Sequence, residues 1–80
     1  MAKVEVRLPS LGDEAEGATV QFWHFEEGDE VDKDDDLVEL ATDKAVFNVP
    51  APVSGVLKEI VASEGDVVKE GDLLAFLERR

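Results

Sequence analysis

The chain has 80 residues, of which 44% are hydrophobic, so it is long enough for one small domain with a packed interior and too short for two. Twenty acidic residues against eight basic ones give a formal net charge of −12. That excess argues against binding to nucleic acid or to an anionic membrane, because both need positive charge on the protein. Since the chain has no cysteine, neither a disulfide nor a thiolate metal site can hold the fold.

The start of the chain gives no sign of a targeting or membrane segment. No stretch approaches the ~20 apolar residues of a membrane span, and Met1–Lys3 leads into alternating residues, not into the apolar region of a signal peptide. We therefore expect no membrane association and a cytoplasmic location. The negative charge also opposes pairing of exposed strand edges, so we expect the isolated domain to be a monomer.

In chain order, the sequence predicts short strands separated by turns. Lys3–Leu8 alternates charged and apolar residues with a period of two, as a half-buried strand does. Pro9 ends this strand, and a polar loop with two glycines follows. Val20–Phe25 is rich in aromatic residues and has no helix cap, which favours a second strand. Leu37–Thr42 forms a further strand, and the prolines after Val49 exclude a helix there.

Thr42–Ala45 connects two of these strands and contains one lysine. A four-residue loop built on a type I turn is a common hairpin connection, and Asp43 is a turn former. This geometry places Lys44 at the tip of a hairpin with its side chain toward water. Taken alone, such a lysine is more often a solubilising turn residue than a functional one.

The second half of the chain repeats the first. Glu27–Val31 (EGDEV) matches Glu64–Val68 (EGDVV), 37 positions later, and without a gap Leu37 falls on Leu74. Two copies of one pattern predict two similar layers related by an approximate twofold axis. We therefore predict an all-β fold, a flattened barrel or sandwich of two four-stranded antiparallel sheets with eight short strands and no helix, formed by residues 1–80 as a single domain.

The alternation predicts a core drawn from both copies. Its expected members are Val4, Val6, Val20, Val31, Leu40, Val46, Val49, Val56, Ile60, Val68, Leu74 and Leu77. One turn departs from the repeat, because Asp34 stands where the second copy has Gly71. Since a non-glycine residue at positive φ is costly, we expect this turn to have a different backbone.

The repeat places Lys44 in the connection between the two halves. The first copy ends at Thr42, and the second copy ends near Glu78. A pseudo-symmetric sandwich puts this hairpin and the two chain ends at opposite ends of the molecule. That arrangement suits a carried group better than a pocket.

Three features together resemble the lipoyl domains of 2-oxo acid dehydrogenase complexes, in the biotinyl/lipoyl attachment family. They are Thr42–Ala45 (TDKA), Val49–Val56 (VPAPVSGV) and the two EGD turns, and the similarity extends from Val4 to Glu78. The resemblance implies a barrel-sandwich hybrid fold and a non-catalytic carrier domain, part of or accessory to a dihydrolipoyl acyltransferase.

The resemblance also implies which residues hold the cofactor. Lys44 would be the site of covalent lipoate attachment (N6-lipoyl-lysine), with Asp43 and Ala45 flanking it for recognition. In this family the loop after the first strand lies near the lysine, which would bring Leu11 and Gly12 beside the lipoyl group. Many relatives have glutamate three residues before the lysine, where this chain has Ala41, a change expected to weaken recognition by the lipoylating enzyme.

The implied function is that of a swinging arm that shuttles acyl groups and reducing equivalents between active sites. The implied partners are a lipoate ligase or lipoyl transferase, a thiamine-dependent 2-oxo acid decarboxylase, an acyltransferase core and dihydrolipoyl dehydrogenase. The cofactor supplies the redox and acyl-transfer chemistry, and the protein supplies its location.

Other interpretations stay open. A biotin carboxyl carrier shares the hairpin lysine, although methionines typically flank it there and the only methionine here is Met1. A glycine-cleavage carrier also bears lipoate but has a longer chain with helices. An unmodified acidic interaction module is a third possibility.

The sequence gives less support to an enzyme or a metal-binding protein than to a carrier domain. His24, the only histidine, is expected to be a partly buried structural residue, and nothing singles out a serine partner for it. The spacing of Asp32, Asp34 and Asp36 resembles the start of a calcium loop, but the required glycine and glutamate are missing. We therefore expect no catalytic residue and no metal site.

Overall fold

The computed structural model describes residues 2–10 and 17–80. Within these residues the chain forms eight strands and no helix. Their bounds are β1 (Lys3–Arg7), β2 (Ala18–Trp23), β3 (Glu30–Val31), β4 (Asp36–Ala41), β5 (Val46–Pro50), β6 (Gly55–Ile60), β7 (Val67–Val68) and β8 (Leu73–Arg79). Leu11 and Gly12 lie outside the described residues. No described helix is long and apolar enough to span a membrane.

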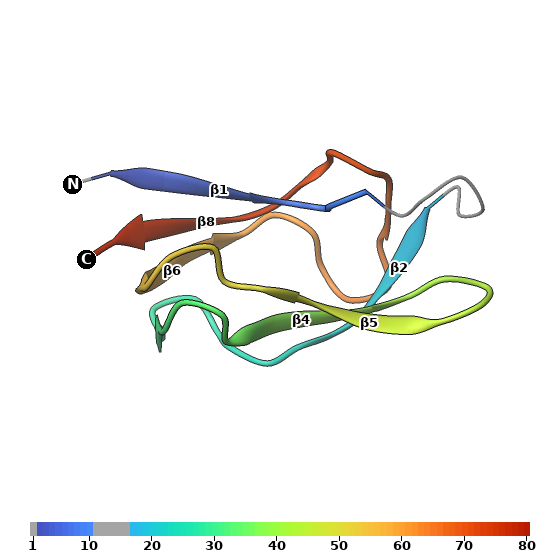
Figure 1. Ribbon diagram of the computed structural model, residues 1–80, viewed down its shortest axis with the longest axis horizontal. Coiled ribbons are helices and arrows are strands. Elements are labelled where there is room, and N and C mark those ends of the chain that lie inside the picture. The colour runs from blue at the N-terminus through green and yellow to red at the C-terminus, as the bar shows by residue number, and fades with distance from the viewer. Residues whose placement is uncertain (1, 11–16) are drawn as a thin grey trace.

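The strands form two four-stranded antiparallel sheets, in the orders β1-β8-β6-β3 and β5-β4-β2-β7. Each sheet combines strands from both halves of the chain, and the molecule measures 37 × 19 × 18 Å. The two chain ends lie together at one end of the long axis, and the hairpin between β4 and β5 lies at the other (Figure 1). The predicted fold and the opposite placement of hairpin and chain ends are confirmed.

The internal repeat is visible in the backbone hydrogen bonds. The N–H of Gly28 donates to the C=O of Leu57 over 2.7 Å, and the N–H of Gly65 donates to the C=O of Val20 over 2.8 Å. These two bonds are related by the same 37-position shift as the sequence repeat, with the two halves exchanged. Each EGD turn is thus bonded to a strand of the other half.

The aspartate of each EGD turn fixes that turn through its side chain. Asp29 Oδ2 accepts from the N–H of Glu26 over 2.9 Å, and Asp66 Oδ2 accepts from the N–H of Ser63 over 2.8 Å. Aspartate favours turns because its short side chain can bond to nearby backbone in this way. The repeated sequence therefore encodes a repeated local structure.

The turn that carries Asp34 has the same backbone as its partner, so the expected difference is wrong. Asp34 has φ of 75° and Gly71 has φ of 85°. Asp34 is held there by its N–H, which donates to the C=O of Ala51 over 2.9 Å, as the N–H of Gly71 donates to Leu8. Aspartate is among the non-glycine residues that tolerate this conformation best.

Most of the predicted core is confirmed. Buried members are Val6, Val20, Val31, Leu40, Val49, Val68, Leu74 and Leu77. Val4 and Ile60 are half-buried and pack against the core, and Val56 is half-buried. Val46 is 62% exposed, so its assignment to the core is wrong. Because Val46 and Val49 are three residues apart in β5, they lie on opposite faces of the sheet.

Sequence alternation missed several fully buried residues. Leu37 and Val38 are neighbours, yet both have 0% exposure, because the strand register shifts between Asp36 and Val38. Leu57 is buried where its neighbour Val56 was expected to be. At Leu37 and Val38 a local bulge breaks the period of two, and alternation alone cannot locate it.

We predict that the EGD glycines contribute through backbone conformation alone. Gly28 and Gly65 have φ of 97° and 92°, and a Cβ added at either meets no atom within 4 Å. Gly28→Ala and Gly65→Ala should each lower the free energy of unfolding by about 1–2 kcal/mol, the cost of a left-handed residue with a Cβ. Urea denaturation measures this change, and Asp34→Gly should stay within about 0.5 kcal/mol of the parent. Equal stability of all four proteins would contradict the argument.

A second prediction separates the exposed face of the lysine-bearing sheet from its core face. Val46→Ala should change the unfolding free energy by less than about 0.5 kcal/mol, because the side chain lies at the surface. Leu40→Ala removes a side chain with 0% exposure and should cost about 2–5 kcal/mol. Thermal and urea unfolding of the two variants provide the comparison. A large decrease in the unfolding free energy of Val46→Ala would show that Val46 belongs to the core.

Candidate functional site

The hairpin between β4 and β5 presents Lys44 at its tip. Ala41 pairs with Val46 as the last pair of the ladder, which leaves Thr42–Ala45 as the four-residue loop that the sequence predicts. The side chains of Asp43, Lys44 and Ala45 are exposed. In Figure 1 this yellow-green loop is the end of the molecule farthest from the labelled chain ends.

Thr42 is the residue that organises the loop, and the sequence analysis gave it no such role. Its hydroxyl accepts from the backbone N–H of Lys44 over 3.2 Å and from that of Ala45 over 3.1 Å, and donates to the C=O of Ala45 over 3.3 Å. Its own N–H donates to the same carbonyl over 2.8 Å. A threonine two residues before the lysine was the available signal, because Ser and Thr hydroxyls commonly bond to backbone groups in turns.

A groove lies beside the hairpin on the outer side of β2 and β7. It has a volume of about 510 Å³ and is lined by Gly17, Thr19, Gln21, Ala41, Thr42, Asp43, Val67 and Lys69. Asp43, predicted as a flanking recognition residue, therefore also borders a groove. Ala45 is exposed and does not line it.

A larger hollow, about 960 Å³, contains His24 and Ser63 and none of the loop residues 42–45. His24 is exposed, so the expectation that it is partly buried is wrong. Its Nε2 lies 2.8 Å from Asn48 Oδ1, and its ring meets that of Phe22 edge-on with centroids 5.2 Å apart. The histidine is thus engaged with an amide and an aromatic ring at the surface.

Two carboxylates of the acidic turn Asp32–Asp36 make contacts within the protein. Asp35 Oδ2 accepts from the N–H of Asp32 over 2.9 Å, and the carboxylate of Asp32 lies 2.9 Å from Arg80. Within residues 2–10 and 17–80, no group of three or more His, Cys, Asp or Glu side chains could hold a metal ion.

Together, these features define a class of protein. A short all-β body holds an exposed lysine on a hydrogen-bonded hairpin, at the end opposite to its chain termini. This is the architecture of a carrier domain, in which a covalently attached group is displayed to other proteins.

Comparison with known proteins defines the family. Residues 4–77 match the biotin/lipoyl attachment model, described as "Biotin-requiring enzyme". The chain is 47% identical over 74 residues to the dihydrolipoyllysine-residue succinyltransferase component of the 2-oxoglutarate dehydrogenase complex of Bartonella vinsonii subsp. berkhoffii, covering 92% of this chain and 18% of that protein. It is 35% identical to the acetyltransferase component of the pyruvate dehydrogenase complex of Staphylococcus epidermidis, covering 92% of this chain and 17% of that one.

Solved structures similar to this chain include a lipoyl domain and a carboxylase. The lipoyl domain of the 2-oxoglutarate dehydrogenase complex from Azotobacter vinelandii has a TM-score of 0.77 and 37% identity, with coverage of 95% of this chain and 96% of that one. A multi-domain long-chain acyl-CoA carboxylase has a TM-score of 0.80 at 23% identity, covering 98% of this chain and 7% of that one, which shows a shared fold.

The chain therefore belongs to the biotin/lipoyl attachment family, among its lipoyl domains, and the resemblance seen in the sequence is confirmed. It is a carrier domain and not a catalyst, and the cofactor of such domains is lipoate bound covalently to a lysine. The chain spans less than a fifth of the length of the curated relatives that it matches, 18% and 17% of the two described above.

We predict that the Thr42 hydroxyl rigidifies the loop. Thr42→Val keeps the side-chain shape but removes its hydrogen bonds to Lys44 and Ala45. The variant should lose about 1 kcal/mol of stability and exchange its Lys44 and Ala45 amide hydrogens faster. Hydrogen exchange followed by NMR measures the effect, and Thr42→Ser, which keeps the hydroxyl, is the matched control. Identical exchange in Thr42→Val and the parent would remove this role from Thr42.

Proposed function

We propose that Lys44 is the residue that carries lipoate, joined through an amide to its Nζ. The observation that supports this assignment is the exposed position of Lys44 at the tip of the hairpin, fixed by Thr42 and remote from the chain ends. The residues present fit the group, because an exposed loop with a groove beside it accommodates a long aliphatic chain without disturbing the core.

The protein's own residues hold and orient the attachment point. The ladder pair Ala41–Val46 and the Thr42 hydroxyl fix the backbone on both sides of the lysine, so that an acylating enzyme meets one loop conformation. Amide formation removes the positive charge of the lysine. When bound, lipoate supplies a dithiolane that takes part in redox and acyl-transfer chemistry. Attachment to one compact domain keeps the local concentration at each successive active site near the mM range.

The relatives support a particular complex as the setting. Three of the curated relatives that are 40–47% identical are components of 2-oxoglutarate dehydrogenase, as is the structural neighbour at 37% identity. The pyruvate-complex relative described above is 35% identical. We propose that this domain serves a 2-oxoglutarate dehydrogenase complex.

This setting implies four partners. They are a lipoate ligase or lipoyl transferase that modifies Lys44, a thiamine-dependent 2-oxo acid decarboxylase, an acyltransferase core and dihydrolipoyl dehydrogenase. The flanking roles of Asp43 and Ala45 in recognition are part of the same proposal, and both side chains are exposed for contact. A biotin carrier is the second candidate, because the family model that matches residues 4–77 is described as "Biotin-requiring enzyme".

We predict that lipoylation occurs at Lys44 alone. Incubation with lipoate, ATP and a lipoate ligase should raise the intact mass by one lipoyl group, and Lys44→Arg should abolish the gain without loss of stability. Lys33→Arg, which changes another exposed turn lysine, should be modified like the parent. Intact-mass spectrometry and peptide mapping give the answer. A gain with biotin and a biotin ligase, and none with lipoate, would assign the domain to the second candidate.

A further inference from the structure

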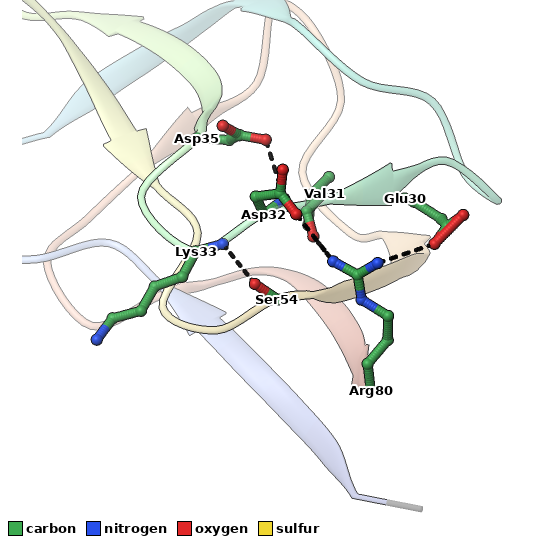
Figure 2. Close-up of polar contacts among 7 residues, drawn as sticks. All are labelled: Glu30, Val31, Asp32, Lys33, Asp35, Ser54 and Arg80. Atoms are coloured by element: carbon green, nitrogen blue, oxygen red, sulfur yellow. Dashed lines mark hydrogen bonds and ion pairs between the residues drawn. The ribbon is translucent and has the colours of Figure 1, made fainter.

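At the end of the molecule that holds the chain termini, the side chain of Arg80 connects two strands of one sheet. Arg80 follows β8 and spans to the edge strand β3 (Figure 2). Its guanidinium lies 3.0 Å from Glu30 Oε1 and 2.9 Å from Asp32 Oδ1, and it donates to the C=O of Val31 over 3.3 Å. Its backbone N–H donates to the C=O of Ser54 over 3.2 Å.

The internal repeat maps this site onto the groove beside Lys44. A shift of 37 positions relates Glu30 to Val67, Asp32 to Lys69 and Ser54 to Gly17, and it relates Arg80 itself to Asp43. The four equivalents, Gly17, Asp43, Val67 and Lys69, all line the groove. The groove is therefore the counterpart of the site that Arg80 fills in the other half.

Two replacements leave the groove open. Asp43 has a short side chain in place of the long side chain of Arg80. Gly17 has no side chain where Ser54 uses its Oγ to accept from the N–H of Lys33 over 2.8 Å (Figure 2). A Cβ added to Gly17 would lie 3.0 Å from the C=O of Val68 and 3.5 Å from Val67 Cγ1, so a side chain there would enter the groove.

The chemistry of the groove also differs from that of its counterpart. Two carboxylates, Glu30 and Asp32, receive a cation in one half. In the other half their equivalents are Val67, which is 71% exposed, and Lys69, which lines the groove together with the oppositely charged Asp43. A lining with a bare valine and balanced charge suits an uncharged aliphatic chain better than an ion, because apolar contact is gained and no unpaired charge is buried.

Lys44 lies close enough to the groove for a long group on its side chain to enter it. Arg80 crosses from β8 past β6 to β3, and the equivalent course runs from β4 past β2 to β7. Two strand spacings correspond to about 10 Å. Lys44 follows Asp43 in the loop after β4, so a long substituent on its side chain has the length to follow the same course.

We propose that the groove between the hairpin and β7 is a docking site for the neutral aliphatic arm formed when Lys44 is lipoylated. In this state the arm lies along Gly17, Thr19 and Val67, much as Arg80 lies against its own edge strand. The carried group thus has a rest position on its own domain, from which it leaves to reach a partner enzyme. This inference depends on the proposed modification of Lys44.

The test compares the unmodified and lipoylated domain by NMR. With ¹⁵N-labelled protein, lipoylation should shift the amide signals of Gly17, Thr19, Val67 and Lys69 in addition to those of the loop. With a ¹³C-labelled lipoyl group, the carbon signals of the arm should be broader than those of free lipoamide. Shifts confined to residues 42–46, with arm signals as sharp as those of the free compound, would overturn the proposal.

Matched variants separate docking from an unspecific effect. Val67→Glu places a charge in the groove and should lower the docked-to-free ratio about tenfold, a change of about 1.4 kcal/mol. Val61→Glu adds the same charge to an exposed valine that does not line the groove and should leave the groove shifts unchanged. Gly17→Ser, which copies Ser54, should also sharpen the arm signals. Equal effects of the two glutamate variants would exclude a specific groove.

The outcomes also distinguish this inference from the proposed function. Failure of Lys44 to accept lipoate, seen by intact mass, would remove both. Complete lipoylation with a freely mobile arm in the parent protein would leave the carrier function in place and remove the docking site alone.

Discussion

The structure depends on the way each half of the chain closes the turn of the other. The Gly28 N–H donates to Leu57 and the Leu57 N–H donates back to Asp29, and the second EGD turn makes the same two bonds with Val20. These bonds are backbone to backbone and join segments far apart in the sequence. Neither half has a complete sheet by itself, because the sheets are β1-β8-β6-β3 and β5-β4-β2-β7. The core of an 80-residue chain without disulfides is therefore assembled only when both halves are present.

This interlocking explains the position of Lys44. The approximate twofold axis makes the β4–β5 hairpin the equivalent of the two chain ends. The Thr42 N–H donates to Ala45 over 2.8 Å, and at the other end the Arg79 N–H donates to Ala2 over 2.9 Å. One of these equivalent ends is a closed loop that displays Lys44, and the other holds residues Ala2 and Arg79. A group on the lysine would thus lie at the opposite end of the long axis from these residues (Figure 1).

The two ends have diverged in chemistry while their backbones stayed alike. At the terminal end, Arg80 is held by two carboxylates and a carbonyl. At the lysine end, the equivalent surface is an open groove with a bare valine. The same comparison of halves shows that Asp34 and Gly71 share a left-handed turn despite their different side chains. The internal repeat therefore allows equivalent sites to be compared within one molecule, and the comparison shows where their chemistry differs.

The fold class, the strand-rich halves and the loop that contains Lys44 could be predicted from the amino-acid sequence. Those features depend on local signals, namely period-two alternation, the EGD turns and the four-residue connection at Thr42–Ala45. The burial of both Leu37 and Val38 could not be predicted in this way, because a shift of register between paired strands is set by the partner strand. The hydroxyl network of Thr42 and the groove of Gly17, Asp43, Val67 and Lys69 were likewise decided by the tertiary structure. The groove brings together segments from both halves, and no local pattern records which of them meet.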